Sequence, residues 1–110
     1  MSTLYIAGPM TGLPQLNYPA FHKAARQLRA SGYTVLNPAE SPAPCRNPSW
    51  EDWMRVAIAL LIQADHVATL DGWEHSRGAQ VEVNLALGLG MSFDPVERHL
   101  HVAAKIAGTR

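Results

Sequence analysis

The stretch His66–Gly90, HVATLDGWEHSRGAQVEVNLALGLG, decides the fold. Its first five residues, His66–Leu70, predict a short strand that ends at Asp71-Gly72, a dipeptide typical of turns. Ser76 then offers a helix N-cap, and the residues that follow predict a helix to about Leu89. The stretch therefore predicts a strand, a loop and a helix, which is one repeat of a parallel α/β fold.

The same order of strand, loop and helix occurs twice before this stretch. Thr3–Ala7 predicts a first strand, which ends at a loop rich in proline and glycine. A helix then begins near Asn17, which can cap it, with Pro19 suited to the first turn, and it ends at Gly32. Tyr33–Leu36 predicts the second strand.

Another helix follows a second proline-rich loop. Ser49 is its expected N-cap, and Asp52 three residues later comes close to the pattern of a capping box. Its apolar stripe comprises Trp53, Val56, Ala57, Leu60 and Leu61. Beyond the quoted stretch, Met91–Phe93 predicts a fourth strand and Val96–Ile106 a final helix.

The alternation of these elements predicts a three-layer α/β/α domain with a flavodoxin-like or Rossmann-like sheet of about four parallel strands. With strand order 2-1-3-4, the chain reverses direction between the first and third strands. Ligands of such sheets bind outside the carboxyl ends of the strands at this switch point. The two loops expected there are Gly8–Asn17 and Asp71–Arg77.

The composition predicts one small globular domain that spans residues 1–110. Hydrophobic residues make up 47% of the chain and charged residues 16%, which is typical of a folded rather than a disordered protein. Nine acidic and nine basic side chains balance, which argues against a nucleic-acid polymer or an anionic membrane as a partner.

The sequence also argues against secretion, membrane insertion and metal binding. No apolar run approaches the roughly 20 residues of a spanning helix, and the start, MSTLYIAGPM, lacks the features of a secretion signal. Cys45 is the only cysteine, which excludes an internal disulfide. His99 and His101 alternate as on one face of a strand, but without a nearby carboxylate they make a poor metal site. We therefore expect a cytoplasmic protein without a metal.

Glu82 has the most unusual surroundings of any ionisable residue in the chain. It is the only charged residue between Gly78 and Phe93, and an unpaired buried carboxylate is costly. Helical side chains lean toward the N-terminus, so Glu82 would point toward the loop after the third strand. Gly78 and Ala86, four residues to either side, leave room for a ligand. On helix statistics alone, the pattern also fits a partly exposed glutamate.

The loop before this helix carries further candidate residues. Asp71-Gly72 places a carboxylate at the end of a strand, where α/β enzymes hold acids and bases, although Asp-Gly is also an ordinary turn. Ser76, Arg77 and Gly78 combine a hydroxyl, a cation and a helix N-terminus, which together suit an anion. A capping serine beside a surface arginine explains the same residues.

The first loop and the tryptophans are weaker candidates. The loop residues are Gly8, Pro9, Met10, Thr11 and Gly12, and the two glycines would let backbone approach a sugar or phosphate. This loop is neither a P-loop nor a GxGxxG motif. Trp50, Trp53 and Trp73 can stack on a base. We expect Trp53 in the core and Trp73 as the better stacking residue.

Four segments together resemble the small phage and bacterial proteins of the DUF4406 type, over residues 4 to about 90. They are YIAGPMTG, the helix start NYPAF, VLNPAE and DGWEHSRGAQVEVNLALGLG. The most specific part is Asp71-Gly72 followed by Ser-x-Gly-x-x-x-Glu-x-x-x-Ala over 76–86. These proteins are similar to nucleoside 2-deoxyribosyltransferases and to nucleotide N-glycosidases.

The resemblance implies cleavage of the N-glycosidic bond of a deoxynucleoside or nucleotide. The family's catalytic glutamate falls on Glu82, which would attack the anomeric carbon, after which water or a second base resolves the glycosyl-enzyme. It places Asp71 near the base, as an aid to its protonation, and Tyr5 beside the glutamate. It also implies that Gly8 and the loop after it line the sugar side, and that no cofactor is required.

Two details bear on the substrate and on partners. Transferases of free nucleosides tend to carry Asp where this chain has Ser76, whereas N-glycosidases of 5′-monophosphates carry Ser, so we favour a nucleotide. The GPMTG loop, however, differs from the phosphate loop of those hydrolases. The resemblance also implies a homodimer or larger homo-oligomer. Two alternatives stay open: a non-catalytic nucleotide-binding module, and an interaction protein that docks through the proline-rich loop Asn37–Pro48.

Overall fold

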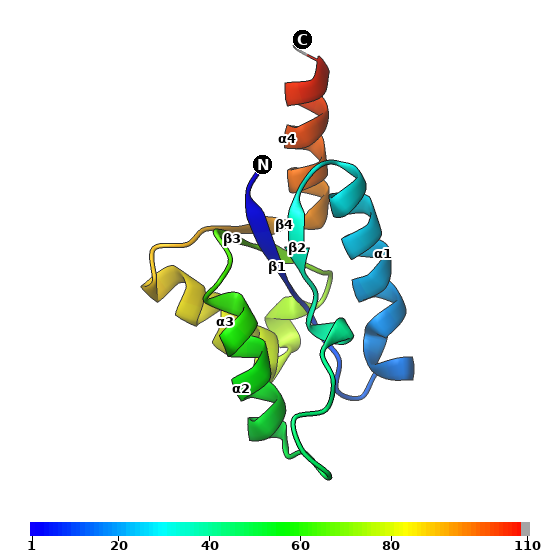
Figure 1. Ribbon diagram of the computed structural model, residues 1–110, viewed down its shortest axis with the longest axis vertical. Coiled ribbons are helices and arrows are strands. Elements are labelled where there is room, and N and C mark those ends of the chain that lie inside the picture. Colours follow the sequence, from blue (N-terminus) through cyan, green and yellow to red (C-terminus); the bar gives the residue numbers. More distant parts are fainter. Residues whose placement is uncertain (109–110) are drawn as a thin grey trace.

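The computed structural model describes residues 1–108 and contains a four-stranded parallel sheet with the order β2-β1-β3-β4 (Figure 1). The strands are β1 (Thr3–Ala7), β2 (Thr34–Leu36), β3 (His66–Thr69) and β4 (Phe93–Pro95). The predicted fold class and strand order are confirmed. Among the described residues, no helix has both the length and the apolar character needed to span a membrane.

Helices cover both faces of the sheet and give three layers. They are α1 (Tyr18–Ala30), α2 (Trp50–Leu61), α3 (Arg77–Gly88) and α4 (Val96–Gly108). Helices α1 and α4 pack on one face, and α2 and α3 pack on the other (Figure 1). Alternate side chains of β1 serve the two layers: Leu4 and Ile6 face α1 and α4, whereas Tyr5 and Ala7 face α2 and α3. A central strand buried on both faces is typical of a parallel sheet.

The helix ends follow the local signals of the sequence. Ser49 and Asp52 form a reciprocal capping box at the start of α2. The Ser76 hydroxyl accepts a hydrogen bond from the Ala79 N–H at 3.2 Å and caps α3. Gly32 follows α1 with φ +102°, a left-handed conformation that closes the helix. These caps confirm the predicted starts of α2 and α3.

The fourth strand begins two residues later than predicted. The reason lies in the end of α3, because its last carbonyl groups accept hydrogen bonds from the residues between the helix and the strand. The Met91 N–H donates to the Ala86 carbonyl at 2.9 Å, and Gly90 is left-handed with φ +78°. The segment around Met91 therefore terminates the helix, and pairing with β3 starts only at Phe93.

Helix α1 begins where predicted, directly after Asn17 and with Pro19 in its first turn, but the expected cap is not formed. Asn17 is left-handed, and its side chain does not cap the helix but donates to the Pro9 carbonyl at 3.0 Å. A short 3-10 helix, Pro14–Asn17, precedes α1, and Gln15 and Leu16 share the left-handed conformation, with φ 53°. Three consecutive non-glycine residues with positive φ are unusual. They bend the chain so that the first loop lies against the start of α1.

Candidate active site

A cavity of about 400 Å³ lies beyond the carboxyl end of β1, between α1, α2 and α3. Its lining comprises Tyr5, Gly8, Met10, Thr11, Leu16, Tyr18, Phe21, Pro38, Ser41, Trp50, Trp53, Met54, Val56, Ala57, Ser76, Gly78, Ala79 and Glu82. Tyr18, Trp50 and Gly78 belong to the first turns of these helices, which begin at the carboxyl edge of the sheet (Figure 1). Small-molecule sites occupy about 300–1,000 Å³ and are mostly apolar, and this cavity has both properties.

The cavity contains one buried acid, Glu82, which is 6% exposed. Its helix α3 packs on the sheet face where Tyr5 emerges from the middle of β1. The Tyr5 hydroxyl donates a short hydrogen bond to Oε2 of Glu82, and both groups are buried. The sheet thus fixes the orientation of the carboxylate, while its place in the lining leaves it accessible to a ligand.

Burial determines the protonation of this pair. Removal from water raises the pKa of Glu82 to about 7, and the hydrogen bond from Tyr5 acts in the opposite direction. Burial, followed by the nearby charge of Glu82, raises the pKa of Tyr5 well above its ordinary value, so its hydroxyl remains a donor. Near neutral pH, Glu82 therefore exists in both forms and can act as a nucleophile, a base or an acid.

Tyr5→Phe is expected to raise the pKa of Glu82 further, because phenylalanine cannot donate the hydrogen bond that stabilises the carboxylate. A hydrogen bond to a charged group contributes about 1.5–3 kcal/mol, which corresponds to an upward move of the titration midpoint by about one pH unit or more. Carbon NMR of the Glu82 side chain over a series of pH values measures this midpoint.

Tyr18→Phe is the matched control for this measurement. Tyr18 lines the same cavity from α1, but its hydroxyl is not the one that bonds Glu82. We expect the Glu82 midpoint to stay at about 7 in that variant. An unchanged or lower midpoint in Tyr5→Phe would contradict the role of Tyr5 as the donor.

The start of α3 lies in the cavity wall, but Arg77 does not. Ser76 and Gly78 line the cavity, and a Cβ at Gly78 would lie 3.2 Å from Sδ of Met54. Glycine therefore allows the close contact between α3 and α2. Arg77 is exposed, and its Cζ lies 3.7 Å from the centre of the Trp50 ring. The guanidinium stacks on an indole rather than pointing at a ligand.

The structure does not bring Asp71, Gly72 or Trp73 into the cavity. Asp71 is exposed and lines a separate hollow of about 260 Å³, together with residues of α1 and α4. Trp73 packs edge-on against Phe93, with ring centres 5.3 Å apart. Gly72 is left-handed, with φ +86°, and the sharp turn there separates the two side chains on either side of it.

The first loop contributes in part. Gly8, Met10 and Thr11 line the cavity, whereas Pro9 and Gly12 are not among its lining residues. A Cβ at Gly8 would lie 2.8 Å from Cβ of Leu70, so only glycine lets the ends of β1 and β3 come this close. The loop leaves the sheet after Ala7, the last residue of β1, and forms one wall of the site.

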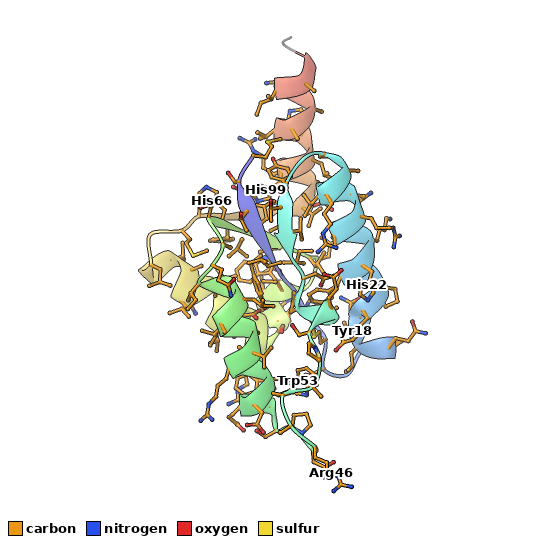
Figure 2. The ribbon with its side chains drawn as sticks, in the orientation of Figure 1. Tyr18, His22, Arg46, Trp53, His66 and His99 are labelled. Atoms are coloured by element: carbon orange, nitrogen blue, oxygen red, sulfur yellow. The ribbon has the colours of Figure 1, made fainter. Side chains whose placement is uncertain are left out.

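The aromatic wall formed by α2 was not predicted as a site. Trp50, Trp53 and Met54 line the cavity from the first turn and a half of α2, and Tyr18 faces them from α1. Figure 2 shows Trp53 and Tyr18 on these two helices, at the end of the molecule that holds the carboxyl edge of the sheet. The helical stripe had suggested that Trp53 belongs to the core, but its side chain lines the cavity instead. The signal for this wall was that α2, like α1 and α3, begins at the carboxyl edge of a parallel sheet, where ligands bind.

Charge is scarce in the lining. Within residues 1–108, Glu82 is the only charged side chain there, and no Lys, Arg or His contributes. The described part of the chain contains no group of three or more His, Cys, Asp and Glu side chains that could hold a metal ion. His99 lies in α4 rather than in a strand; it is buried, with Nε2 3.2 Å from the Val67 carbonyl, whereas His101 is exposed.

The comparisons with known proteins concern most of the chain. A sequence model of the family described as a domain of unknown function (DUF4406) matches residues 2–93. No curated protein matches the chain. Among solved structures, the fold is similar to that of a 2-deoxyribosyltransferase from the psychrotolerant bacterium Bacillus psychrosaccharolyticus, with a TM-score of 0.65. The two are 23% identical, and the match covers 83% of this chain and 69% of the other.

Proposed function

This chain belongs to the DUF4406 family, and from that membership and the site around Glu82 we propose that it cleaves or transfers the N-glycosidic bond of a nucleoside or nucleoside 5′-monophosphate. The family match confirms the resemblance that the motifs indicated. The observation that carries the proposal is the buried carboxylate of Glu82, oriented by Tyr5 and open to an apolar cavity. The 2-deoxyribosyltransferase activity of the structural neighbour supports the same class of reaction.

In the first step, a carboxylate oxygen of Glu82 attacks the anomeric carbon of the sugar. The bond from this carbon to the base nitrogen breaks, and its electron pair leaves with the base. The transition state resembles an oxocarbenium ion. Since Glu82 is the only charged side chain among the described lining residues, its negative charge stabilises this cation without competition.

The second step regenerates the carboxylate. Water, or a second base, attacks the anomeric carbon of the glycosyl ester, and the carbon–oxygen bond to Glu82 breaks. Over the two steps, the base that leaves in the first step takes up one proton, and the group that attacks in the second step gives one up. The resemblance had implied that Asp71 helps to protonate the base, but its carboxyl lies outside the cavity of this chain. Water is therefore the proton source in this proposal.

The cavity offers support for both parts of the substrate. Tyr18, Trp50 and Trp53 provide aromatic surface for a base. For a 5′-phosphate, the Ser76 hydroxyl and the first N–H groups of α3, those of Arg77 and Gly78, lie at the positive end of the helix dipole. The absence of a cation among the described lining residues instead favours an unphosphorylated nucleoside.

Chromatography of the products tests the proposal directly. The protein is incubated with deoxynucleosides and their 5′-monophosphates, with and without a second base as acceptor. Release or exchange of a base supports the glycosidic reaction, and the preferred member identifies the phosphate requirement. If no member releases or exchanges its base, the chain is instead a binding module of the same fold.

We also propose that a second copy of the chain packs against α3. The outer side of this helix exposes Val81 (39%), Leu87 (51%) and, just after its end, Leu89 (54%). Apart from Arg77 at its start, its only charged residue is the buried Glu82. An uncharged surface with several exposed apolar side chains is typical of a protein contact. Sedimentation velocity should show a dimer that Leu87→Lys converts to the 12.0 kDa monomer; a wild-type monomer at every concentration would contradict the proposal.

A further inference from the structure

Trp50 and Arg77 form a stacked pair that joins the first residues of two helices. Trp50 is the first residue of α2 and lines the cavity, and Arg77 is the first residue of α3. The guanidinium carbon lies 3.7 Å from the centre of the indole ring. Arg77 is not among the lining residues, so the guanidinium covers one face of the ring without entering the cavity.

The backbone around this pair is fixed from both helices. The capping box of Ser49 and Asp52 fixes the first turn of α2, and Trp50 is the first residue of that turn. On the other side, a Cβ at Gly78 would lie 4.0 Å from Cζ2 and Nε1 of Trp50, so the backbone of α3 lies against the edge of the indole. The ring is thus held at one face by a cation and at one edge by a glycine.

We propose that the second face of Trp50 is the surface on which the aromatic ring of the ligand stacks, and that Arg77 is a positioning residue that acts through Trp50. The identification of that ring as a nucleobase rests on the proposed function. The guanidinium, the indole and the base then form three parallel layers. Arg77 contributes no contact to a phosphate, in contrast to the role that the sequence had suggested for it.

The chemistry of the pair supports this arrangement. A cation over an indole face is attracted by the ring's quadrupole, and arginine also stacks as a flat group. Arg77 and Gly78 already restrict the rotamer of Trp50 in the free protein. A ligand that binds therefore has little side-chain freedom left to remove. A half-buried tryptophan without the arginine would have to be ordered by the ligand itself.

Binding of free adenine, guanine, thymine and cytosine, measured by calorimetry, tests the stack without any turnover. Stacking on an aromatic side chain is worth about 1–3 kcal/mol per base, so Trp50→Leu should weaken the best-binding base about tenfold to hundredfold. Trp50→Phe keeps a flat ring and should restore most of the affinity. Trp73→Phe is the matched control, because Trp73 packs against Phe93 outside the cavity lining.

Arg77→Gln tests the positioning role. The exposed arginine contributes about 0.5–1 kcal/mol to such a pair, so we expect about threefold weaker binding of the free base. The same factor should appear in KM for a deoxynucleoside and for its 5′-monophosphate, with kcat unchanged. Arg77→Lys should recover part of the loss, and the exposed Arg98 in α4, changed to Gln, should have no effect.

Three results would overturn the inference. The first is wild-type affinity for free bases in a folded Trp50→Leu variant. The second is a loss in Arg77→Gln that is confined to phosphorylated ligands, which would make Arg77 a phosphate contact. The third is a wild-type protein that binds none of the four bases. A wild type that binds bases through Trp50 but cleaves no substrate would instead overturn the proposed reaction and support the stack.

Discussion

Glu82→Gln is expected to lower base release or exchange by about a thousandfold or more, with the fold intact. Glutamine has nearly the same shape and can still accept the hydrogen bond from Tyr5, so the cavity keeps its form. It carries no negative charge, however, and its amide oxygen is a poor nucleophile toward the anomeric carbon. The substitution therefore removes both the attack and the stabilisation of the oxocarbenium-like transition state.

Initial rates of base release, followed by chromatography on the best substrate, measure this loss. Glu74→Gln is the matched control: it makes the same chemical change at an exposed side chain outside the cavity lining, and it should retain the wild-type rate. Circular dichroism should show the same helix content in all three proteins. A Glu82→Gln variant with more than about a tenth of the wild-type rate would remove Glu82 from the role of nucleophile.

The same substitution is expected to stabilise the folded protein above about pH 7 and to leave its stability near pH 4 unchanged. Burial raises the pKa of Glu82 from 4.5 to about 7 in the folded state. Below pH 4.5, Glu82 is protonated in both the folded and the unfolded state, so its titration does not reduce the free energy of unfolding. As the pH rises through this window, only the unfolded chain releases the proton readily, so folding loses about 3 kcal/mol. Glutamine does not titrate and avoids the loss.

Urea unfolding at about pH 4 and about pH 8 measures the effect as a difference in the free energy of unfolding. We expect Glu82→Gln to exceed the wild type at the higher pH only, whereas Glu74→Gln should follow the wild type at both. A variant less stable than the wild type at high pH would mean that Glu82 is not desolvated. Together, the two Glu82→Gln predictions describe a residue that lowers stability in order to provide reactivity.

Local signals explain why most of the fold was predictable. The helix ends depend on residues that are close together in the sequence: Ser49 with Asp52, the Ser76 cap and the left-handed Gly32. Such signals can therefore be recognised from the sequence alone. The isolation of Glu82 in an otherwise uncharged helix was equally visible. Its burial follows because the helix periodicity places it with Ala79, Val83 and Ala86 on the face that packs against the sheet.

The site was harder to predict because it depends on the directions of side chains, and these are fixed by the packing of helices and loops that are distant in the sequence. Gly72 is left-handed, and this conformation places Asp71 and Trp73 outside the cavity, which no spacing rule reveals. Trp53 fits the apolar stripe of its helix equally well as a core residue or as cavity wall. Only the packing of α2 beside the first loop, at the edge of the sheet, decides between the two.

The left-handed run Gln15, Leu16 and Asn17 has a consequence for anyone who redesigns this protein. A left-handed conformation costs a non-glycine residue about 1–2 kcal/mol, so glycine at position 15 would relieve strain. Leu16, however, forms part of the cavity wall, and glycine beside it would widen the range of positions the wall can adopt. The substitution would thus raise thermal stability and lower substrate discrimination, at a segment that lies outside the Tyr5–Glu82 pair.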